Sequence, residues 1–568
     1  MRNGEIAEAF DELASLYELD GAVVYRVVAY RNAAKAIRES GVSVAEMARQ
    51  GRAEELPGVG KTIAEKIDAL LEGGSIPAAD KLKARIPHGL TQLTRIPGLG
   101  PKRARLLYEH LGVGSLDDLR RAAEEGRLKD VPGFGAKAEE NVRAALAAGE
   151  RAEQRLLLPK ALEVGDELVG SLREHAEKVE LAGSVRRMVD TCKDLDIVAA
   201  ASDPDALVER FCSLAPIDVV HTASAAGARA TTHSGLPVDL RIVPEETFGN
   251  LLQHFTGSGK HNEALRTHAV RRGLHVSEYG IADEASGETH TCATEEEVYG
   301  RLGMQYVPPE LRENRGELEA SREGRLPDLV AVEDLRGDLH MHTVASDGRN
   351  TIEEMAETAR DRGYEYAAIT DHSASHGFGD HVSPDELLRQ IERIRALEVP
   401  GLRLLAGTET NVLPNGSLDY DDELLEQLDW VVASVHTSFR MSEGEMTDRI
   451  VRALEHPLVD ALGHPTGRLI GRRSPYAVDL DRVIETAART GTFLEINANP
   501  DRRDLPDVFA RAAAEAGVTI VIDSDAHGVE RLSNIRYGVA TARRAWLTAE
   551  NVANTRPWAE LDELRKRR

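Results

Sequence analysis

The C-terminal part of the chain, from Asp338 onward, alternates short apolar runs with amphipathic stretches in a regular order. The apolar runs read DLHMHT, YAAITD, LRLLAGTET, DWVVASVH, DALGHP, TFLEIN and TIVIDSDAHG, and stretches such as TIEEMAETARDRG and DELLRQIERIRAL separate them. Runs of this length are typical of buried strands, and the stretches between them have the spacing of helices. Repeated units of this kind predict a parallel sheet, which either closes as a barrel or stays open.

Side chains of the kind that bind metal ions stand at the ends of these runs. A lone histidine near a strand end is usually a hydrogen-bonded polar residue, but nine candidate ligands at successive strand ends are not explained in that way. The carboxyl ends of parallel strands meet at one face, so we expect a metal centre there. Mixed imidazole and carboxylate ligands suit Mn²⁺ or Zn²⁺. The nine residues are His340, His342, Asp347, His372, Glu409, His436, His464, Asp525 and His527.

The first 150 residues contain one short motif three times, in LPGVGKTIAEKI, IPGLGPKRARLL and VPGFGAKAEENV. A Gly-rich turn before a helix frees backbone N–H groups where a phosphate is favoured, and a following Lys adds charge. A single copy is equally well explained as a tight turn. Three copies favour the phosphate-binding interpretation, with the candidate contacts Gly58, Gly60, Lys61, Gly98, Gly100, Lys102, Gly133, Gly135 and Lys137.

The stretch GSVRRMVDTCKDLDIV, which begins at Gly183, combines a polar turn with two carboxylates. Its serine hydroxyl, backbone N–H groups and two guanidinium groups form a suitable cradle for a triphosphate. Asp194 and Asp196 are two residues apart, so on a strand they face the same side. Asp239, in PVDLRIV, supplies the third carboxylate needed to hold two Mg²⁺ ions for phosphoryl transfer. The alternative is an exposed turn, which is common for so short a pattern.

The charge of the chain is unevenly distributed. The formal net charge is -26, but residues 1–150 carry 22 Lys and Arg against 23 Asp and Glu, so the acid lies in the remainder. A nearly neutral first part with basic clusters is compatible with nucleic acid as a partner. The acidic last part is expected either to hold cations or to keep the protein in solution.

Three cysteines, Cys192, Cys212 and Cys292, occur without paired spacing. This argues against both a disulfide framework and a cysteine zinc site, and it suits a reducing compartment. The N-terminus is acidic and amphipathic, and no apolar run reaches the roughly 18 residues of a membrane span. We therefore expect a cytoplasmic protein without a membrane partner.

From Gly4 to about Arg315 the chain resembles the family X DNA polymerases. The resemblance rests on the first Pro-Gly-x-Gly motif, the Gly-Ser, Arg-Arg and Asp-x-Asp arrangement, the third aspartate, and HFTGSGKHNEALR, which is similar to the thumb motif of the family. It implies that the motif repeats are helix-hairpin-helix units, which grip DNA without reading sequence.

The same resemblance implies roles for individual residues. Asp194, Asp196 and Asp239 would bind Mg²⁺ or Mn²⁺, and Asp239 would help activate the primer 3′-hydroxyl. The nucleotide would be held by Gly183, Ser184, Arg187, Phe255, Gly257 and Asn262, and Arg266 would meet the template. Lys66 matches the lysine that forms a Schiff base with an abasic sugar in some relatives, although an ordinary phosphate-binding or solvated lysine is the other interpretation.

Three positions depart from the family pattern. Met188 and Lys193 stand where the family usually has glycines, and His254 replaces the usual aromatic residue. Because glycine tolerates positive φ and close backbone approach, these side chains are expected to reshape the loop before Asp194.

Residues from about Leu335 to Trp558 resemble the polymerase and histidinol phosphatase (PHP) domain, a distorted seven-stranded barrel. The resemblance implies up to three Mn²⁺ or Zn²⁺ ions. One would bind His340, His342, Glu409 and Asp525, a second Glu409, His436 and His464, and a third Asp347, His372 and His527.

These interpretations define a multidomain chain with a helical N-terminal region, an α+β nucleotidyltransferase palm and thumb, and a distorted (β/α)7 barrel. We predict an N-terminal helical domain over 1–80, a further helix-hairpin-helix region over 81–150, a palm over 151–243, a thumb over 244–315, a linker over 316–334 and the PHP domain over 335–568.

The combined prediction is a monomeric DNA repair polymerase that fills short gaps from dNTPs. Its PHP domain would act as a metal-dependent 3′–5′ exonuclease, with AP endonuclease or 3′-phosphodiesterase activity as further options. Two alternatives stay open. In one, the polymerase half is a DNA-binding platform with little catalysis, as Met188 and Lys193 suggest. In the other, the barrel acts on a small phosphomonoester.

Overall fold

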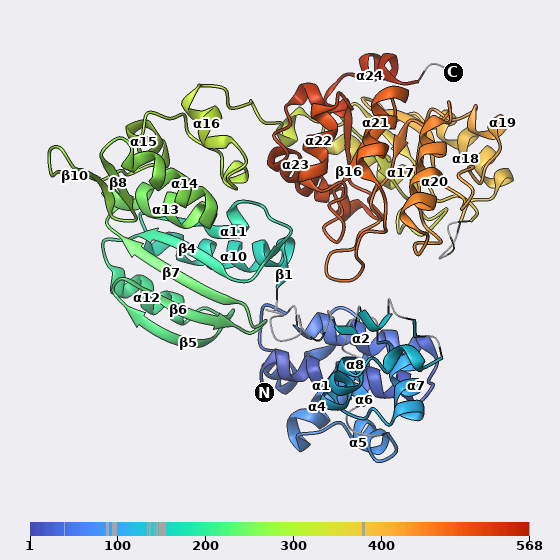
Figure 1. Cartoon of the computed structure of the whole chain (residues 1–568), viewed down its shortest axis with the longest axis horizontal. Coiled ribbons are helices and arrows are strands. Elements are labelled where there is room, and N and C mark those ends of the chain that lie inside the picture. The colour runs from blue at the N-terminus through green and yellow to red at the C-terminus, as the bar shows by residue number, and fades with distance from the viewer. Residues whose placement is uncertain are drawn as a thin grey trace. The chain divides into compact units, whose positions relative to one another are not determined.

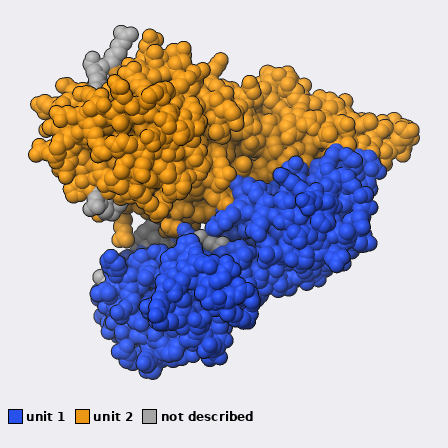
Figure 2. Space-filling model, turned by 180° about the vertical axis from the view of Figure 1, so that it is seen from behind, with its two compact units in different colours: residues 1–156, 160–182, 192–248 blue, residues 157–159, 183–191, 249–568 orange. Residues whose placement is uncertain are grey.

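The computed structural model describes residues 1–38, 40–86, 90–93, 99–132, 134–135, 138–140, 142–143, 146, 155–375, 377 and 381–566. The chain forms two compact units, which Figure 2 shows in different colours. The first comprises residues 1–156, 160–182 and 192–248, and the second comprises residues 157–159, 183–191 and 249–568. The loop 183–191 therefore belongs to the same unit as the C-terminal barrel.

Short helices make up the N-terminal region (Figure 1). α1 (Asn3–Leu19) and α2 (Val24–Arg38) place Phe10 and Ile37 in a common core. Further helices are α3 (Val44–Arg49), α4 (Lys61–Gly73), α5 (Pro77–Lys83), α6 (Leu90–Leu93), α7 (Pro101–Leu111) and α8 (Leu116–Glu124). Leu99, Leu107 and Leu119 belong to a second core. The region is helical, as the sequence predicts.

The next part contains a five-stranded sheet in the order β2-β4-β7-β6-β5. Its strands are β2 (Lys178–Leu181), β4 (Leu195–Ala200), β5 (Ile217–Ser224), β6 (Gly227–Thr232) and β7 (Pro237–Val243). The helices α10 (Leu158–Leu172) and α12 (Pro204–Cys212) accompany it. β4 and β7 are parallel neighbours, while β2 and β6 flank them in antiparallel orientation. The α+β class predicted for this part is confirmed.

Helices and a small sheet follow in the predicted thumb. They are α13 (Phe248–Thr256), α14 (Gly259–Val270), β8 (Leu274–Ser277), β9 (Gly280–Asp283), β10 (Thr289–His290) and α15 (Glu295–Arg301). The stretch 316–334, predicted as a linker, contains α16 (Glu317–Arg322), and Leu318 and Leu329 contribute to the core that also holds Tyr299. Apolar residues within this charged sequence explain why it packs.

Seven parallel strands form the C-terminal sheet in sequence order. They are β11 (Gly337–Met341), β12 (Tyr366–Ile369), β13 (Arg403–Asn411), β14 (Trp430–Ser434), β15 (Ala461–Leu462), β16 (Phe493–Asn497) and β17 (Ile520–Asp523). A parallel bridge between Met341 and Ala526 joins the first strand to the end of the last. Of the two topologies left open by the strand pattern, the sheet therefore takes the barrel.

Helices between the strands cover the barrel. They are α17 (Ile352–Asp361), α18 (Pro384–Ala396), α19 (Asp422–Leu425), α20 (Glu443–Glu455), α21 (Leu480–Thr490) and α22 (Asp507–Glu515), and α23 (Ile535–Arg544) and α24 (Trp558–Leu564) follow the last strand. Alternate strand residues such as Trp430 and Phe493 form an interior core together with Trp558 of α24. Their neighbours on the strands, such as Val431 and Leu494, pack in the larger core that includes the covering helices.

An irregularity in β11 positions its histidines. The register shifts between Asp338 and Met341, so Leu339 belongs to the interior core while Met341, two residues on, belongs to the outer one. A bulge of this kind re-aims the side chains that follow it. His340 and His342 therefore both turn toward the inside at the carboxyl end of the barrel.

Within the described ranges, no helix combines the length and apolar character needed to cross a bilayer.

Candidate active sites

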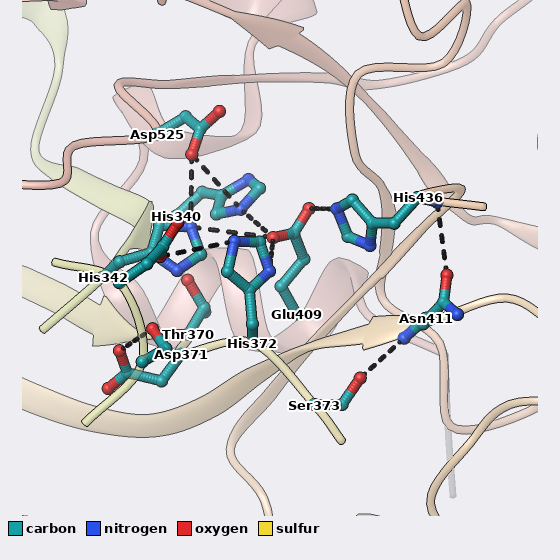
Figure 3. Close-up of polar contacts among 12 residues, drawn as sticks. His340, His342, Thr370, Asp371, His372, Ser373, Glu409, Asn411, His436 and Asp525 are labelled. Carbon is teal, nitrogen blue, oxygen red and sulfur yellow. Dashed lines mark hydrogen bonds and ion pairs between the residues drawn. The ribbon is translucent and has the colours of Figure 1, made fainter. Parts of the chain in front are cut away.

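All nine candidate ligands of the barrel lie at its carboxyl end. His340 and Glu409 stand on β11 and β13, and the other seven follow the ends of β11, β12, β14, β15 and β17. Figure 3 shows several of these side chains converging on Glu409. Parallel strands place their carboxyl ends together, which explains how residues nearly 190 positions apart in the sequence meet.

Glu409 is the centre of this cluster. Its carboxylate oxygens lie 2.8 Å from His372 Nδ1, 3.1 Å from His436 Nε2 and 2.8 Å from His464 Nε2. They also lie 3.4 Å from His340 Nε2 and 3.6 Å from His342 Nε2. The side chain is 1% exposed. A single buried carboxylate thus faces five imidazoles.

Two aspartates extend the cluster on the other side. Asp525 Oδ1 lies 3.2 Å from His342 Nε2 and 3.9 Å from His340 Nε2. Asp347 Oδ1 lies 3.2 Å from His527 Nε2 and 3.6 Å from His372 Nε2. His342 and His372 therefore each lie between two carboxylates.

Burial and charge set the protonation of the cluster. Burial lowers the pKa of His342 to about 4 and that of His464 to about 3. Burial also lowers the pKa of His527, but the hydrogen bond to Asp347 and the charge of Asp525 more than offset it and raise the pKa to about 9. The carboxyl of Glu409 has its pKa held well below its usual range, since the surrounding histidines outweigh burial.

These side chains fit metal ions. Three groups bring their ligand atoms within 4.8 Å of one another: His342, Asp347, His372 and His527; His340, His342 and Asp525; and His372, Glu409 and His436. His340 Nε2 and Glu409 Oε2 are buried and make no hydrogen bond within the described residues. Buried polar atoms without hydrogen bonds that converge on shared points are expected of a site built for cations.

Two acidic residues near the cluster have supporting positions. Glu495 on β16, which the sequence interpretation missed, lies 2.6 Å from His340 Nδ1 and accepts a 2.5 Å hydrogen bond from the His464 backbone. The available signal was a carboxylate within the apolar run TFLEIN. Asp371 instead accepts hydrogen bonds from Thr343, Ser346 and Gln390, so it fixes the loop after β11. Such partners orient the residues that bind a metal.

The three carboxylates of the N-terminal half stand on neighbouring strands. Asp196 on β4 is in register with Asp239 on β7, and Asp194 immediately precedes β4. Arg241 Nε lies 2.9 Å and Arg229 Nε 3.2 Å from the Asp239 carboxylate. Within the part of the chain that the structure describes, these three aspartates do not bring their ligand atoms within 4.8 Å of one another, unlike the barrel cluster.

The turn between α13 and α14 is closed by Asn262. Its amide nitrogen donates to the carbonyl oxygens of His254 at 2.6 Å and Gly257 at 3.2 Å, and its amide oxygen accepts from Gln253 at 3.1 Å. A Cβ on Gly257 would lie 2.3 Å from Asn262 Oδ1. Asn262 therefore shapes this turn. Of the other two predicted residues of this stretch, Arg266 is exposed on α14 and Phe255 is half-buried.

Gly-rich turns precede helices at the described motif repeats. Gly58 has a φ of 78°, Gly60 caps α4, and Lys61 is exposed in its first turn. Gly100 caps α7 in the same way, and Gly135 lies in a loop. Gly98, Gly133, Lys137 and the side chain of Lys102 lie outside the described residues.

Lys66 lies on α4. Its Nζ is 3.5 Å from the Thr62 carbonyl oxygen and 5.9 Å from the centre of the Tyr30 ring. The side chain lines a hollow of about 600 Å³ together with Arg26, Lys81 and Arg85. Asp20, which pairs with Arg85 at 3.2 Å, and Glu65 line the same hollow, so its cations outnumber its carboxylates by four to two and favour an anionic ligand.

Comparison with curated proteins identifies the family. The chain is 37% identical, over 573 residues and the full length of both chains, to the "DNA polymerase/3'-5' exonuclease PolX" of Bacillus subtilis (strain 168). It belongs to the bacterial family X DNA polymerases that carry a C-terminal PHP domain.

Family models match four parts of this polymerase. A helix-hairpin-helix domain matches residues 1–76, a SAM-like helix-hairpin-helix tandem 90–148, the DNA polymerase beta thumb 251–313 and the PHP domain 338–499. The C-terminal part is also similar to probable phosphatases. Those of Caldanaerobacter subterraneus and Acetivibrio thermocellus are 33% and 32% identical over 34% of this chain, covering 75% and 78% of theirs.

One departure from the polymerase family has a visible structural consequence. Met188 has a φ of 55°, in the left-handed region that favours glycine. A non-glycine residue pays roughly 1–2 kcal/mol for this conformation. The chain therefore retains the backbone shape for which the family uses glycine, and the larger side chain adds strain there.

The predicted triphosphate-binding residues of this polymerase lie in the second unit. Ser184 Oγ is buried without a hydrogen-bond partner within the described residues. Arg187 pairs with Glu313, 3.0 Å away, and donates to the Thr256 carbonyl oxygen at 2.9 Å. Arg187 is thus held by the thumb, and a phosphate on it would have to replace Glu313.

Gly257→Ala is expected to destabilise the thumb turn by about 2 kcal/mol, within the usual range for a mutation that breaks hydrogen bonds. The added Cβ displaces the Asn262 amide, whose three hydrogen bonds close the turn. Thermal unfolding and primer extension measure the effect. Gly259→Ala is the matched control, because its Cβ would meet nothing within 4 Å. Equal stability of the two variants would contradict the role given to Asn262.

The metal-free protein is expected to lose stability as the pH rises from about 6.5 to about 9. The pKa of His527 is about 9 in the folded protein and about 6.5 in the unfolded chain. Protonation of His527 therefore stabilises the folded protein, and this stabilisation is complete below about pH 6.5. That stability, about 3 kcal/mol, is lost as the pH passes through the folded-state pKa. All three tryptophans, at 430, 546 and 558, lie in the C-terminal part, so their fluorescence reports the unfolding of that part.

The control for this pH series is His527→Gln, which is expected to show a smaller loss; part of the loss remains, because neighbouring carboxylates also raise the pKa of His340 well above its usual value. If the EDTA-treated wild type is equally stable or more stable at pH 9 than at pH 6.5, the folded protein does not hold the His527 proton over this range.

Proposed function

We propose that the chain fills short gaps in DNA by template-directed nucleotidyl transfer and removes nucleotides from 3′ ends. The observation that carries the proposal is full-length similarity to a relative named for both activities, together with two separate sets of candidate ligands. The substrates are dNTPs and gapped, primer–template or 3′-ended DNA, and the acting form is a monomer.

In the polymerase half, Asp194, Asp196 and Asp239 hold Mg²⁺ or Mn²⁺. These ions, when bound, neutralise phosphate charge and activate the primer hydroxyl. Ser184 and Arg187 bind the triphosphate, with Arg187 exchanging Glu313 for phosphate oxygens. A guanidinium held beforehand by a carboxylate is already oriented for a bidentate anion.

In the barrel, the nine residues of the cluster hold up to three Mn²⁺ or Zn²⁺ ions. When bound, these ions would make a nucleophilic water available at neutral pH and would stabilise charge on the leaving oxygen. Glu409 orients five imidazoles, and Glu495 fixes His340 and the His464 backbone. His527 gives up its proton when the cations enter, because a protonated imidazole cannot act as a ligand.

Separate inactivation of the two sites tests this function in the full chain. Asp196→Asn is expected to abolish primer extension on a gapped duplex and to spare the shortening of a 3′ end, and Glu409→Gln is expected to do the reverse. Loss of both activities in either single variant, with the fold intact, would contradict two separate sites.

The second candidate function is hydrolysis of a small phosphomonoester by the barrel, which the similarity to probable phosphatases favours. The full chain with Mn²⁺ would be offered p-nitrophenyl phosphate and a single-stranded oligonucleotide. Cleavage of the monoester with an intact 3′ end would support this candidate, and the opposite pattern would exclude it.

A further inference from the structure

A loop of the polymerase half is held by the barrel. The loop 183–191 contains the predicted triphosphate-binding residues Ser184 and Arg187 and precedes the predicted catalytic aspartates in the sequence, and it belongs to the second unit. Arg544 on α23 donates to the Arg187 carbonyl oxygen at 2.7 Å. The two oxygens of Asp190 face Arg468 Nη1 at 2.9 Å and Arg503 Nη1 at 3.1 Å. One carboxylate thus pairs with two arginines of the barrel.

Arg503 depends on this carboxylate. Its side chain is 0% exposed, and burial lowers its pKa to about 10, with Asp190 as the largest opposing influence. Its backbone has a φ of 44°, which for a non-glycine residue persists only when neighbours hold it. Removing the partner of a buried charge leaves that charge uncompensated, so the segment would have to rearrange.

The segment 502–504 also contacts the metal cluster. Arg468 donates from Nε to the Arg502 carbonyl oxygen at 2.8 Å, which ties the two arginine-bearing segments together. Arg502 Nε lies 3.6 Å from Oδ2 of Asp525, one of the candidate ligands. Asp504 accepts hydrogen bonds of 3.1 and 3.2 Å from the backbone of Thr466, two residues after His464. The same segment therefore touches Asp190 on one side and the surroundings of two ligands on the other.

We propose that Asp190 is a positioning residue for the metal cluster of the barrel, acting through the pairs with Arg468 and Arg503 on the segment that supports Asp525 and His464. The inference rests on the proposed function of that cluster. It means that cation binding in the nuclease site depends on a residue of the polymerase loop, four residues before the catalytic Asp194. The loop that handles the nucleotide and the site that removes nucleotides would then be linked by one carboxylate.

A Mn²⁺ titration of the full-length, metal-free protein tests the proposal without relying on activity. Free Mn²⁺ is followed by electron paramagnetic resonance, in an Asp196→Asn background so that the barrel ions dominate. Asp190→Asn is expected to weaken their affinity by about tenfold or more, as for other residues that orient ligands without touching the metal. Asp190→Glu, which keeps the charge, is expected to lose less, and exposed Asp205→Asn is the control expected to stay within about twofold.

A double variant identifies the route of the effect. Asp190→Asn with Arg503→Met removes the buried charge together with its partner, so its Mn²⁺ affinity is expected to be higher than that of Asp190→Asn but about threefold below the starting protein. Unchanged affinity in a folded Asp190→Asn overturns the proposal. If that variant does not fold, starting-level affinity in the double variant overturns it, because neither partner would then be needed.

Mn²⁺ binding by the Asp196→Asn protein, without a change at Asp190, distinguishes a failure of this inference from a failure of the proposed function. If that protein binds no Mn²⁺ at the barrel cluster, the function proposed for that cluster fails. If it binds Mn²⁺ and Asp190→Asn binds equally well, only the role of Asp190 fails.

Discussion

Glu409→Gln is expected to reduce the shortening of a 3′ end by about a thousandfold, which corresponds to roughly 4 kcal/mol of transition-state stabilisation. The carboxylate lies within 3.6 Å of a ring nitrogen of five histidines, so no other residue of the cluster has as many ligand neighbours. Gln keeps the size of the side chain but removes its charge and one ligand oxygen. The release of nucleotides from a labelled single strand in Mn²⁺ measures the effect.

The control for this change is Glu423→Gln, an exposed carboxylate on α19 that is expected to leave the activity unchanged. Primer extension by Glu409→Gln is expected to stay within about twofold of the wild type, since its site uses other ligands. Retention of nuclease activity by this variant would remove Glu409 from the catalytic centre.

Asp196→Asn is expected to lower primer extension on a gapped duplex by about a thousandfold, again some 4 kcal/mol. Asp196 is in register with Asp239 on the parallel neighbour strand, so both carboxylates lie on the same face of the sheet. Two cations would bind there. Asp205→Asn, exposed on α12, is the matched control. Single-nucleotide extension in Mg²⁺ and in Mn²⁺ gives the measurement.

The same experiment tests the alternative hypothesis that the polymerase half is a DNA-binding platform with little catalysis. The strain at Met188 and the pairing of Asp239 with Arg229 and Arg241 are the features that favour a weak site. A wild type that extends the primer, and an Asp196→Asn variant that does not, would exclude the platform. Equal extension by both would show that Asp196 is not catalytic.

The sequence predicts the barrel, and it places the nine candidate ligands at strand ends, because both follow from local patterns. Each strand is a short apolar run, and each ligand follows or ends such a run, so position along the chain fixes position on the carboxyl face. The same logic applied to Glu495 would have found it, but a carboxylate within TFLEIN does not reveal that it faces His340.

Contacts between distant segments are what the sequence does not reveal. Asp190 and Arg503 are separated by 313 positions, and no periodicity pairs them. Asn262 was assigned to the nucleotide by resemblance, whereas the structure shows its amide bonded within the thumb turn. The packing of α16 was hidden by the charged residues around its few apolar ones.

Two separate metal-dependent sites in one chain are expected to appear in anomalous diffraction from Mn²⁺-soaked crystals of the full chain. Up to three peaks are expected within bonding distance of the nine barrel ligands, and a further peak is expected at Asp194, Asp196 and Asp239 when dNTP is present. Absence of Mn²⁺ from the Glu409 cluster in such crystals would contradict this expectation.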